Sequence, residues 1–174
     1  AAWTCKADIL RYLIANGADV NAQNAVYGST ALNIVAGNCS DTEIVSFLLD
    51  TGADIFIRNK VGDSPFLSAV KSGNPSIVDV LILAGSDVNE QTRNGNTPLM
   101  IAAMKDYREV VILLIDKSAN LNVINKSGDT ALSLAQKYKY SDIAQLLKEA
   151  GANEVSSKKR YYPVYLPSPP VFDK

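Results

Sequence analysis

Two short sequence words return along this chain at nearly constant intervals, and this periodicity constrains its fold more than any other feature. The first word, Gly-Ala-Asp-Val-Asn, starts at Gly17 and returns in related form 35, 33, 33 and 33 residues further on. The second, Gly-Ser-Thr-Ala-Leu, starts at Gly28, and related words start at Gly62, Gly95 and Gly128. Chance does not produce nine matches in phase, so we interpret the chain as an array of units of about 33 residues.

Each unit carries the signals of two helices. The first helix follows a hydroxyl residue that can cap it, and Pro65 and Pro98 occupy a first turn, where a missing N–H is harmless. A second helix is predicted from apolar runs whose wide faces need partners on several sides, at 44–49, 77–82, 110–115 and 143–148. A glycine with positive φ can end that helix, and Ser118 replaces it once, at a cost of about 1 kcal/mol. The capping residues are Thr30, Ser64, Thr97 and Thr130, and the terminating glycines are Gly17, Gly52, Gly85 and Gly151.

This repeating unit of a turn and two helices, with its Thr-Pro-Leu and Gly-Ala-Asp words, resembles the ankyrin repeat. The resemblance covers residues 1 to about 153. It implies an all-α solenoid of antiparallel helix pairs, with β-hairpin fingers at right angles and a concave groove between the fingers and the inner helices. We expect an ankyrin-repeat domain over 1–153 and an extended tail over 154–174. Within the domain we expect a truncated first repeat over 1–22 and repeats at about 23–56, 57–89, 90–122 and 123–153.

The chain departs from the family at the histidine of its Thr-Pro-Leu-His word. Asn33, Leu67, Met100 and Ser133 stand there, and the family's histidine is thought to tie neighbouring turns by hydrogen bonds. We expect Asn33 and Ser133 to bond in this way, whereas Leu67 and Met100 can only pack.

Composition argues against several classes of function. No histidine is present among the 174 residues, which removes histidine-dependent nucleophiles and histidine-ligated metals. With 17 basic and 18 acidic residues, the chain lacks the basic excess typical of nucleic-acid binding. No apolar run approaches the roughly 18 to 20 residues that cross a bilayer. The aspartates at 19, 54 and 87 should serve turns. We therefore expect no catalysis, cofactor, metal, nucleic acid or membrane partner.

Candidate binding residues lie where the family pattern places the groove, at the finger tips and at the ends of the inner helices. They are Trp3, Tyr27, Lys71, Arg93, Asn96, Met104, Lys105 and Tyr138. Trp, Tyr, Arg and Met are enriched at interfaces. Tyr27 and Arg93 are the strongest candidates, because a side chain at a finger tip is not needed in the core. The alternatives remain open: lysines at helix ends can simply be solvated, and Trp3 can cover apolar surface at the truncated end.

Cys5 and Cys39 hold nearly equivalent places in the turns of adjacent repeats, and an inserted residue beside Cys39 could extend its turn toward Cys5. A bridge needs Cα atoms within about 7 Å, and adjacent repeats are usually spaced more widely, so we expect no bridge. A bridge, if present, would indicate an oxidising compartment and an exported chain; otherwise a cytoplasmic location is favoured.

Two further surfaces are open to interpretation. On the convex side, Leu83 and Ile112 could form a self-association patch, although scattered apolar residues are common and a monomer is favoured. In the tail, prolines exclude helix, and we expect packing through Val164, Tyr165, Leu166, Val171 and Phe172.

The sequence thus predicts a non-catalytic scaffold that binds a protein or peptide through its groove and fingers. The alternative is a structural or targeting segment of a larger polypeptide whose function lies outside this chain.

Overall fold

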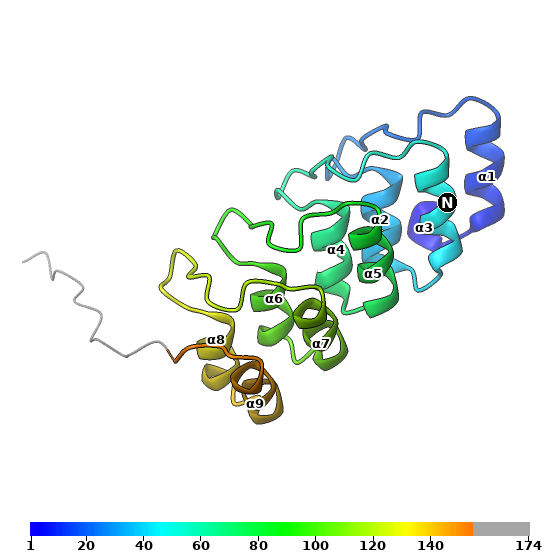
Figure 1. Cartoon of the computed structure of the whole chain (residues 1–174). Coiled ribbons are helices and arrows are strands. Elements are labelled where there is room, and N and C mark those ends of the chain that lie inside the picture. Colours follow the sequence, from blue (N-terminus) through cyan, green and yellow to red (C-terminus); the bar gives the residue numbers. More distant parts are fainter. Residues whose placement is uncertain (155–174) are drawn as a thin grey trace, which may run out of the picture.

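The chain folds into pairs of helices that stack side by side in an elongated row, with loops projecting along one edge (Figure 1). The structure, a computed structural model, describes residues 1–154. Within them lie one short 3₁₀ helix and nine α-helices. The inner series comprises η1 (Ala2–Thr4), α2 (Ala31–Asn38), α4 (Pro65–Ser72), α6 (Pro98–Met104) and α8 (Ala131–Lys137). The outer series comprises α1 (Ala7–Ala15), α3 (Thr42–Asp50), α5 (Pro75–Leu83), α7 (Arg108–Asp116) and α9 (Ser141–Glu149).

The all-α solenoid expected from the sequence is confirmed, and its helix starts are those that the capping signals predict. The hydroxyl of the residue before each complete inner helix accepts a hydrogen bond from the backbone N–H three residues on, at 3.0–3.3 Å. Those acceptors are Thr30, Ser64, Thr97 and Thr130. None of the described helices is long and apolar enough to span a membrane.

Three of the four residues that replace the family's histidine behave as expected. Asn33 Oδ1 accepts a hydrogen bond from the Thr30 N–H, and its amide nitrogen reaches the carbonyl oxygens of Ile57 and Asp63 in the next unit. Ser133 differs from the expectation, because its hydroxyl accepts from the Thr130 N–H at 2.9 Å and donates to the Thr130 carbonyl oxygen at 3.1 Å, which caps its own helix and does not tie it to a neighbouring unit. The other two replacements, Leu67 and Met100, are buried in the core, as expected of side chains that can only pack.

The core runs through the row as one continuous cluster. Inner helices bury residues on most of their surface, whereas each complete outer helix buries a single stripe. The outer stripes are Ile44, Val45 and Leu48; Ile77, Val78 and Leu81; Val110, Val111 and Leu114; and Ile143, Ala144 and Leu147. Helix α1 differs, since Leu10 is its one buried residue. The first helix pair is therefore held by less apolar contact than the others.

Between units, asparagine amides form rungs that join consecutive turns. Asn21 accepts from the Asp54 N–H at 2.8 Å, Asn89 from the Asn120 N–H at 2.8 Å, and Asn122 from the Asn153 N–H at 2.8 Å. Phe56 occupies the equivalent place after Asp54 and lies 68% exposed. One rung of the series is thus replaced by an exposed aromatic ring.

The aspartates at 19, 54 and 87 act in these same turns, as the sequence predicts. Each accepts a hydrogen bond from the backbone N–H two residues on, at 2.7–2.8 Å. Each outer helix is then followed by a residue with positive φ, and Ser118, at φ 62°, adopts this conformation where the other units have glycine.

An ion pair also joins two of the units on the outer side of the fingers. Glu90 accepts hydrogen bonds from Ser64 and from Arg58, and its carboxylate is largely buried. Burial raises the pKa of Glu90, and the bonds to Ser64 and Arg58 oppose that rise without cancelling it.

The fingers differ from expectation in one respect. No residue described in the structure is in a β-strand, so the expected β-hairpins are not formed as paired strands. Each finger is instead a tight turn closed by a hydrogen bond across its base, such as Asn59 N–H to Asp63 O at 2.9 Å and Thr92 N–H to Asn96 O at 3.0 Å. Asn59 Oδ1 also accepts hydrogen bonds from the Val61 and Asp63 N–H groups inside its turn, so these two donors do not serve a strand ladder.

Two further expectations from the sequence concern the tail and the convex side. The expected packing of the tail through Val164, Tyr165, Leu166, Val171 and Phe172 lies outside the described residues. On the convex side, Leu83 is 74% exposed but Ile112 is half-buried, so the two do not form a continuous exposed patch.

Candidate functional site

The concave face contains two adjoining hollows, which between them are lined by seven of the eight candidate residues. The first encloses about 430 Å³ and is lined by residues of the first three units. Its apolar walls are formed by Trp3, Val26, Tyr27, Ile34 and Val61. We call it the apolar compartment.

Trp3 and Tyr27 form the open edge of the apolar compartment. Their ring centroids lie 6.1 Å apart with the planes tilted by 57°, an arrangement within the range of favourable aromatic pairs. Both side chains remain more than half exposed, at 59% and 58%. Two large rings that touch each other yet keep most of their surface in water can still bury that surface against a partner.

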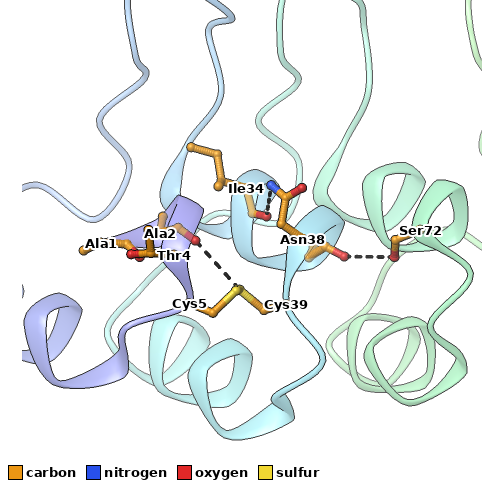
Figure 2. Close-up of a disulfide and its surroundings, with 9 residues drawn as sticks. Ala1, Ala2, Thr4, Cys5, Ile34, Asn38, Cys39 and Ser72 are labelled. Atoms are coloured by element: carbon orange, nitrogen blue, oxygen red, sulfur yellow. Dashed lines mark hydrogen bonds between the residues drawn. A yellow bond between two sulfur atoms is a disulfide. The ribbon is translucent and has the colours of Figure 1, made fainter.

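The position of Trp3 is fixed by a disulfide bond between Cys5 and Cys39, which corrects the expectation that these thiols stay apart. Figure 2 shows the bridge joining the turn after η1 to the turn after α2. The Cα atoms lie 5.7 Å apart, within bonding range. The Cys39 Sγ atom also lies 3.8 Å from the Ala2 carbonyl oxygen. This contact is not a hydrogen bond, because a disulfide sulfur carries no proton.

The backbone explains why the repeat spacing does not keep the sulfurs apart. Cys39 leaves α2 in an extended conformation, with φ −102° and ψ 161°, so the chain runs outward after the helix. Cys5 adopts a left-handed conformation, with φ 49°, and its turn reverses toward the same point. The two turns therefore converge, which brings the Cα atoms within bonding range.

The second hollow encloses about 330 Å³ and follows the first along the row. It brings together five of the eight candidates, namely Lys71, Arg93, Asn96, Met104 and Lys105. Val61 lines both hollows, so the two adjoin at this residue. We call the second hollow the basic compartment.

The cations of the basic compartment are held by different kinds of partner. Lys71 forms an ion pair of 2.6 Å with the buried carboxylate of Asp63. Lys105 donates to the Lys71 carbonyl oxygen at 2.8 Å, and Arg93 donates to the Lys60 carbonyl oxygen at 3.0 Å. Carbonyl acceptors orient Lys105 and Arg93 without neutralising their charge.

Three candidates have structural partners as well as exposure. Asn96 accepts a hydrogen bond from Asn125 at 2.6 Å and so joins two fingers. Met104 is half-buried beneath the groove, packed against the core. Tyr138 lies outside both compartments, 48% exposed, and stacks on Tyr140 with centroids 6.2 Å apart.

Sequence reasoning did not single out Val61, nor the contact between each finger's glycine and a cation of the next finger. Lys60 lies against Gly28, where an added Cβ would meet Lys60 Cγ at 3.0 Å. In the next finger, Arg93 lies against Gly62, where an added Cβ would meet Arg93 Nε at 3.1 Å. Each of these cations stands two residues before its own finger's glycine, and that recurring offset was the available signal.

Comparison with known proteins gives a consistent result. The family described as "Ankyrin repeats (3 copies)" matches residues 1–92 and 66–158. An ankyrin repeat protein of Acanthamoeba polyphaga mimivirus is 36% identical over 67 residues, covering 38% of this chain and 9% of that protein. An ankyrin repeat protein of fowlpox virus (strain NVSL) is 40% identical over 55 residues, covering 29% of this chain and 10% of that protein. The chain thus spans about a tenth of the length of these relatives.

Proposed function

The chain belongs to the ankyrin repeat family, and on that premise we propose that it binds a protein or peptide segment in the groove formed by the apolar and basic compartments. Ankyrin repeats are generally non-enzymatic modules of protein–protein interaction. The observation that carries the proposal is the exposed aromatic pair Trp3 and Tyr27 beside a hollow of about 430 Å³. A partner side chain that fills this hollow would bury apolar surface on both.

Preorganisation supports the same proposal. The disulfide bond holds η1, and therefore Trp3, against the second unit. Arg93 and Lys105 are oriented by backbone carbonyls before any partner arrives. Side chains that are already ordered lose less conformational entropy on binding, which favours a rigid display surface over a surface that folds on contact.

The test selects peptides from a random displayed library on the full chain and then measures their binding to two matched variants. Tyr27→Ala with Arg93→Ala alters the groove. Tyr12→Ala with Arg108→Ala removes the same side chains from exposed sites on α1 and α7. We expect the groove variant to lose at least about tenfold in affinity and the control less than about twofold.

Both variants should keep their melting temperature within a few degrees, as expected of surface changes. Equal losses in the two variants, or no loss in the groove variant, would contradict binding through the groove. Isothermal titration calorimetry measures the affinities, and circular dichroism measures the melting temperatures.

A second proposal rests on a different surface. Helix α1 exposes Ile9, Tyr12 and Leu13, at 45%, 67% and 44%, so its outer face is unusually apolar. Such a face would suit a structural role against further parts of a larger polypeptide. The full reading frame of the gene tests this: additional repeats encoded directly before residue 1 would favour it, and an unrelated short leader would oppose it.

A further inference from the structure

The distribution of charge on this chain is uneven in a way that the net charge of −1 conceals. No Asp or Glu is found in the helices that form the floor of the groove, namely α2, α4, α6 and α8. The outer helices carry eight, namely Asp8, Glu43, Asp50, Asp79, Glu109, Asp116, Asp142 and Glu149. Acidic charge therefore gathers on the convex side, away from the groove.

Along the fingers, cations recur at one register. Lys60, Arg93 and Lys126 each stand two residues before the glycine of their finger, and all three are exposed. The first finger has Val26 in that place, at the apolar compartment. We call the three residues the cation ladder.

Each member of the ladder rests on the finger before it. Lys60 lies against Gly28, Arg93 against Gly62, and Lys126 against Gly95, where an added Cβ would meet the Lys126 backbone nitrogen at 3.3 Å and its Cγ at 3.6 Å. The absence of a side chain at these glycines lets the cations lie flat across them. The ladder is thus held in place by packing.

The charges of Lys60 and Arg93 are available to a partner. Lys60 donates to the Ala25 carbonyl oxygen and Arg93 to the Lys60 carbonyl oxygen, and both acceptors are neutral. The nearby carboxylates are buried, whereas the ladder cations are exposed. Asp63 is paired with Lys71, and Asp129 lies at the base of its own finger. Asp106, in the turn after α6, is an exposed acid at the far end of that helix from the fingers.

Spacing indicates the form of the partner. Packed helices lie about 8–10 Å apart, so successive fingers should present cations at about that interval. A polyproline-like extended peptide rises about 3.1 Å per residue, so side chains three residues apart are separated by about 9 Å. Acidic side chains at every third position would therefore match the ladder.

We propose that the groove binds an extended acidic peptide whose carboxylates, about three residues apart, follow Lys60, Arg93 and Lys126. A large apolar side chain at one end of the peptide enters the apolar compartment beside Trp3 and Tyr27. This proposal rests on the proposed function and adds the chemistry of the partner. A nucleic acid, the other polyanion that a row of cations can attract, is disfavoured because the convex side is acidic and the net charge is −1.

The first test is the composition of the peptides selected on the full chain. Enrichment of Asp and Glu over the unselected library, with an aromatic or aliphatic residue to one side, is expected. Groove-dependent peptides without acidic enrichment would overturn the inference and leave the proposed function standing. Peptides insensitive to Tyr27→Ala would instead contradict the proposed function.

The second test uses a fluorescent peptide with a tryptophan followed by glutamate at every third position, and its glutamine counterpart. Binding of the glutamate peptide should be tighter by about tenfold or more and should weaken with salt. Arg93→Glu should reduce its affinity by about tenfold, whereas Arg108→Glu, with the same change of net charge on α7, should change it by less than about twofold. Equal binding of the two peptides, equal effects of the two variants, or tighter Arg93-dependent binding of single-stranded DNA would overturn the inference.

Discussion

Removal of the Cys5–Cys39 bridge should release the first helix pair while leaving the rest of the row folded. The bridge closes a loop between residues 34 apart, which corresponds to about 4 kcal/mol of chain entropy in the unfolded state. Helix α1 buries Leu10 alone, worth about 1.5–3 kcal/mol. The bridge therefore contributes more than the one buried side chain of α1, and without it the first helix pair should open more often than the rest of the row.

Hydrogen exchange followed by mass spectrometry measures this directly on the full chain. In the variant with Cys5→Ala and Cys39→Ala, amides of α1 should lose protection by about 10²- to 10³-fold, since each 1.4 kcal/mol is worth about tenfold. Amides of α5 to α7 should keep theirs. A reducing agent should give the same result in the native chain and no change in the variant. Unaltered protection of α1 after removal of the bridge would refute the reasoning.

Four further substitutions have expected outcomes that urea unfolding can check. Ser118→Gly should raise the free energy of unfolding by about 1 kcal/mol, because glycine adopts the left-handed φ at this exposed site without strain. Gly85→Ser, the reverse change in another unit, should lower the free energy of unfolding. A loss of stability in Ser118→Gly would contradict this reasoning. Phe56→Asn should add about 1 kcal/mol by restoring a rung to the Asp87 N–H, and an unchanged midpoint would show that no rung forms. The folded-state pKa of Glu90 lies above its ordinary value of 4.5, so folding takes up a proton between the two values. Stability from this group is therefore present at low pH and lost as the pH rises through the folded pKa. In Glu90→Gln this contribution should vanish from the pH profile, and identical profiles would be inconsistent with a raised pKa.

The fold could be predicted from the sequence because each element has a local signal. Capping hydroxyls, terminating glycines and aspartate turns act within a few residues of themselves, and their periodic recurrence fixes the order of the helices. Sequence reasoning also anticipated the different behaviour of Asn33 and Leu67, since one side chain can form hydrogen bonds and the other cannot.

The features that escaped prediction depend on contacts between units. The direction in which the chain leaves α2 decides whether Cys39 reaches Cys5, and the repeat pattern does not report that direction. Val61 lines both compartments because of the finger's conformation, which periodicity does not report. The candidates' binding roles and the repeat boundaries stay predictions.

The packing of each ladder cation on the preceding finger's glycine has a consequence for recombination. A substitution at Gly62 would be felt first at Arg93, so the surface chemistry of one unit is supported by its predecessor. Exchange of a whole unit between homologous arrays would separate a cation from its supporting glycine at one junction. At the other junction it would place a residue from a different array on a ladder glycine. Shuffled chimeras of this protein should therefore be cut so that each glycine travels together with the basic residue that follows it one unit later.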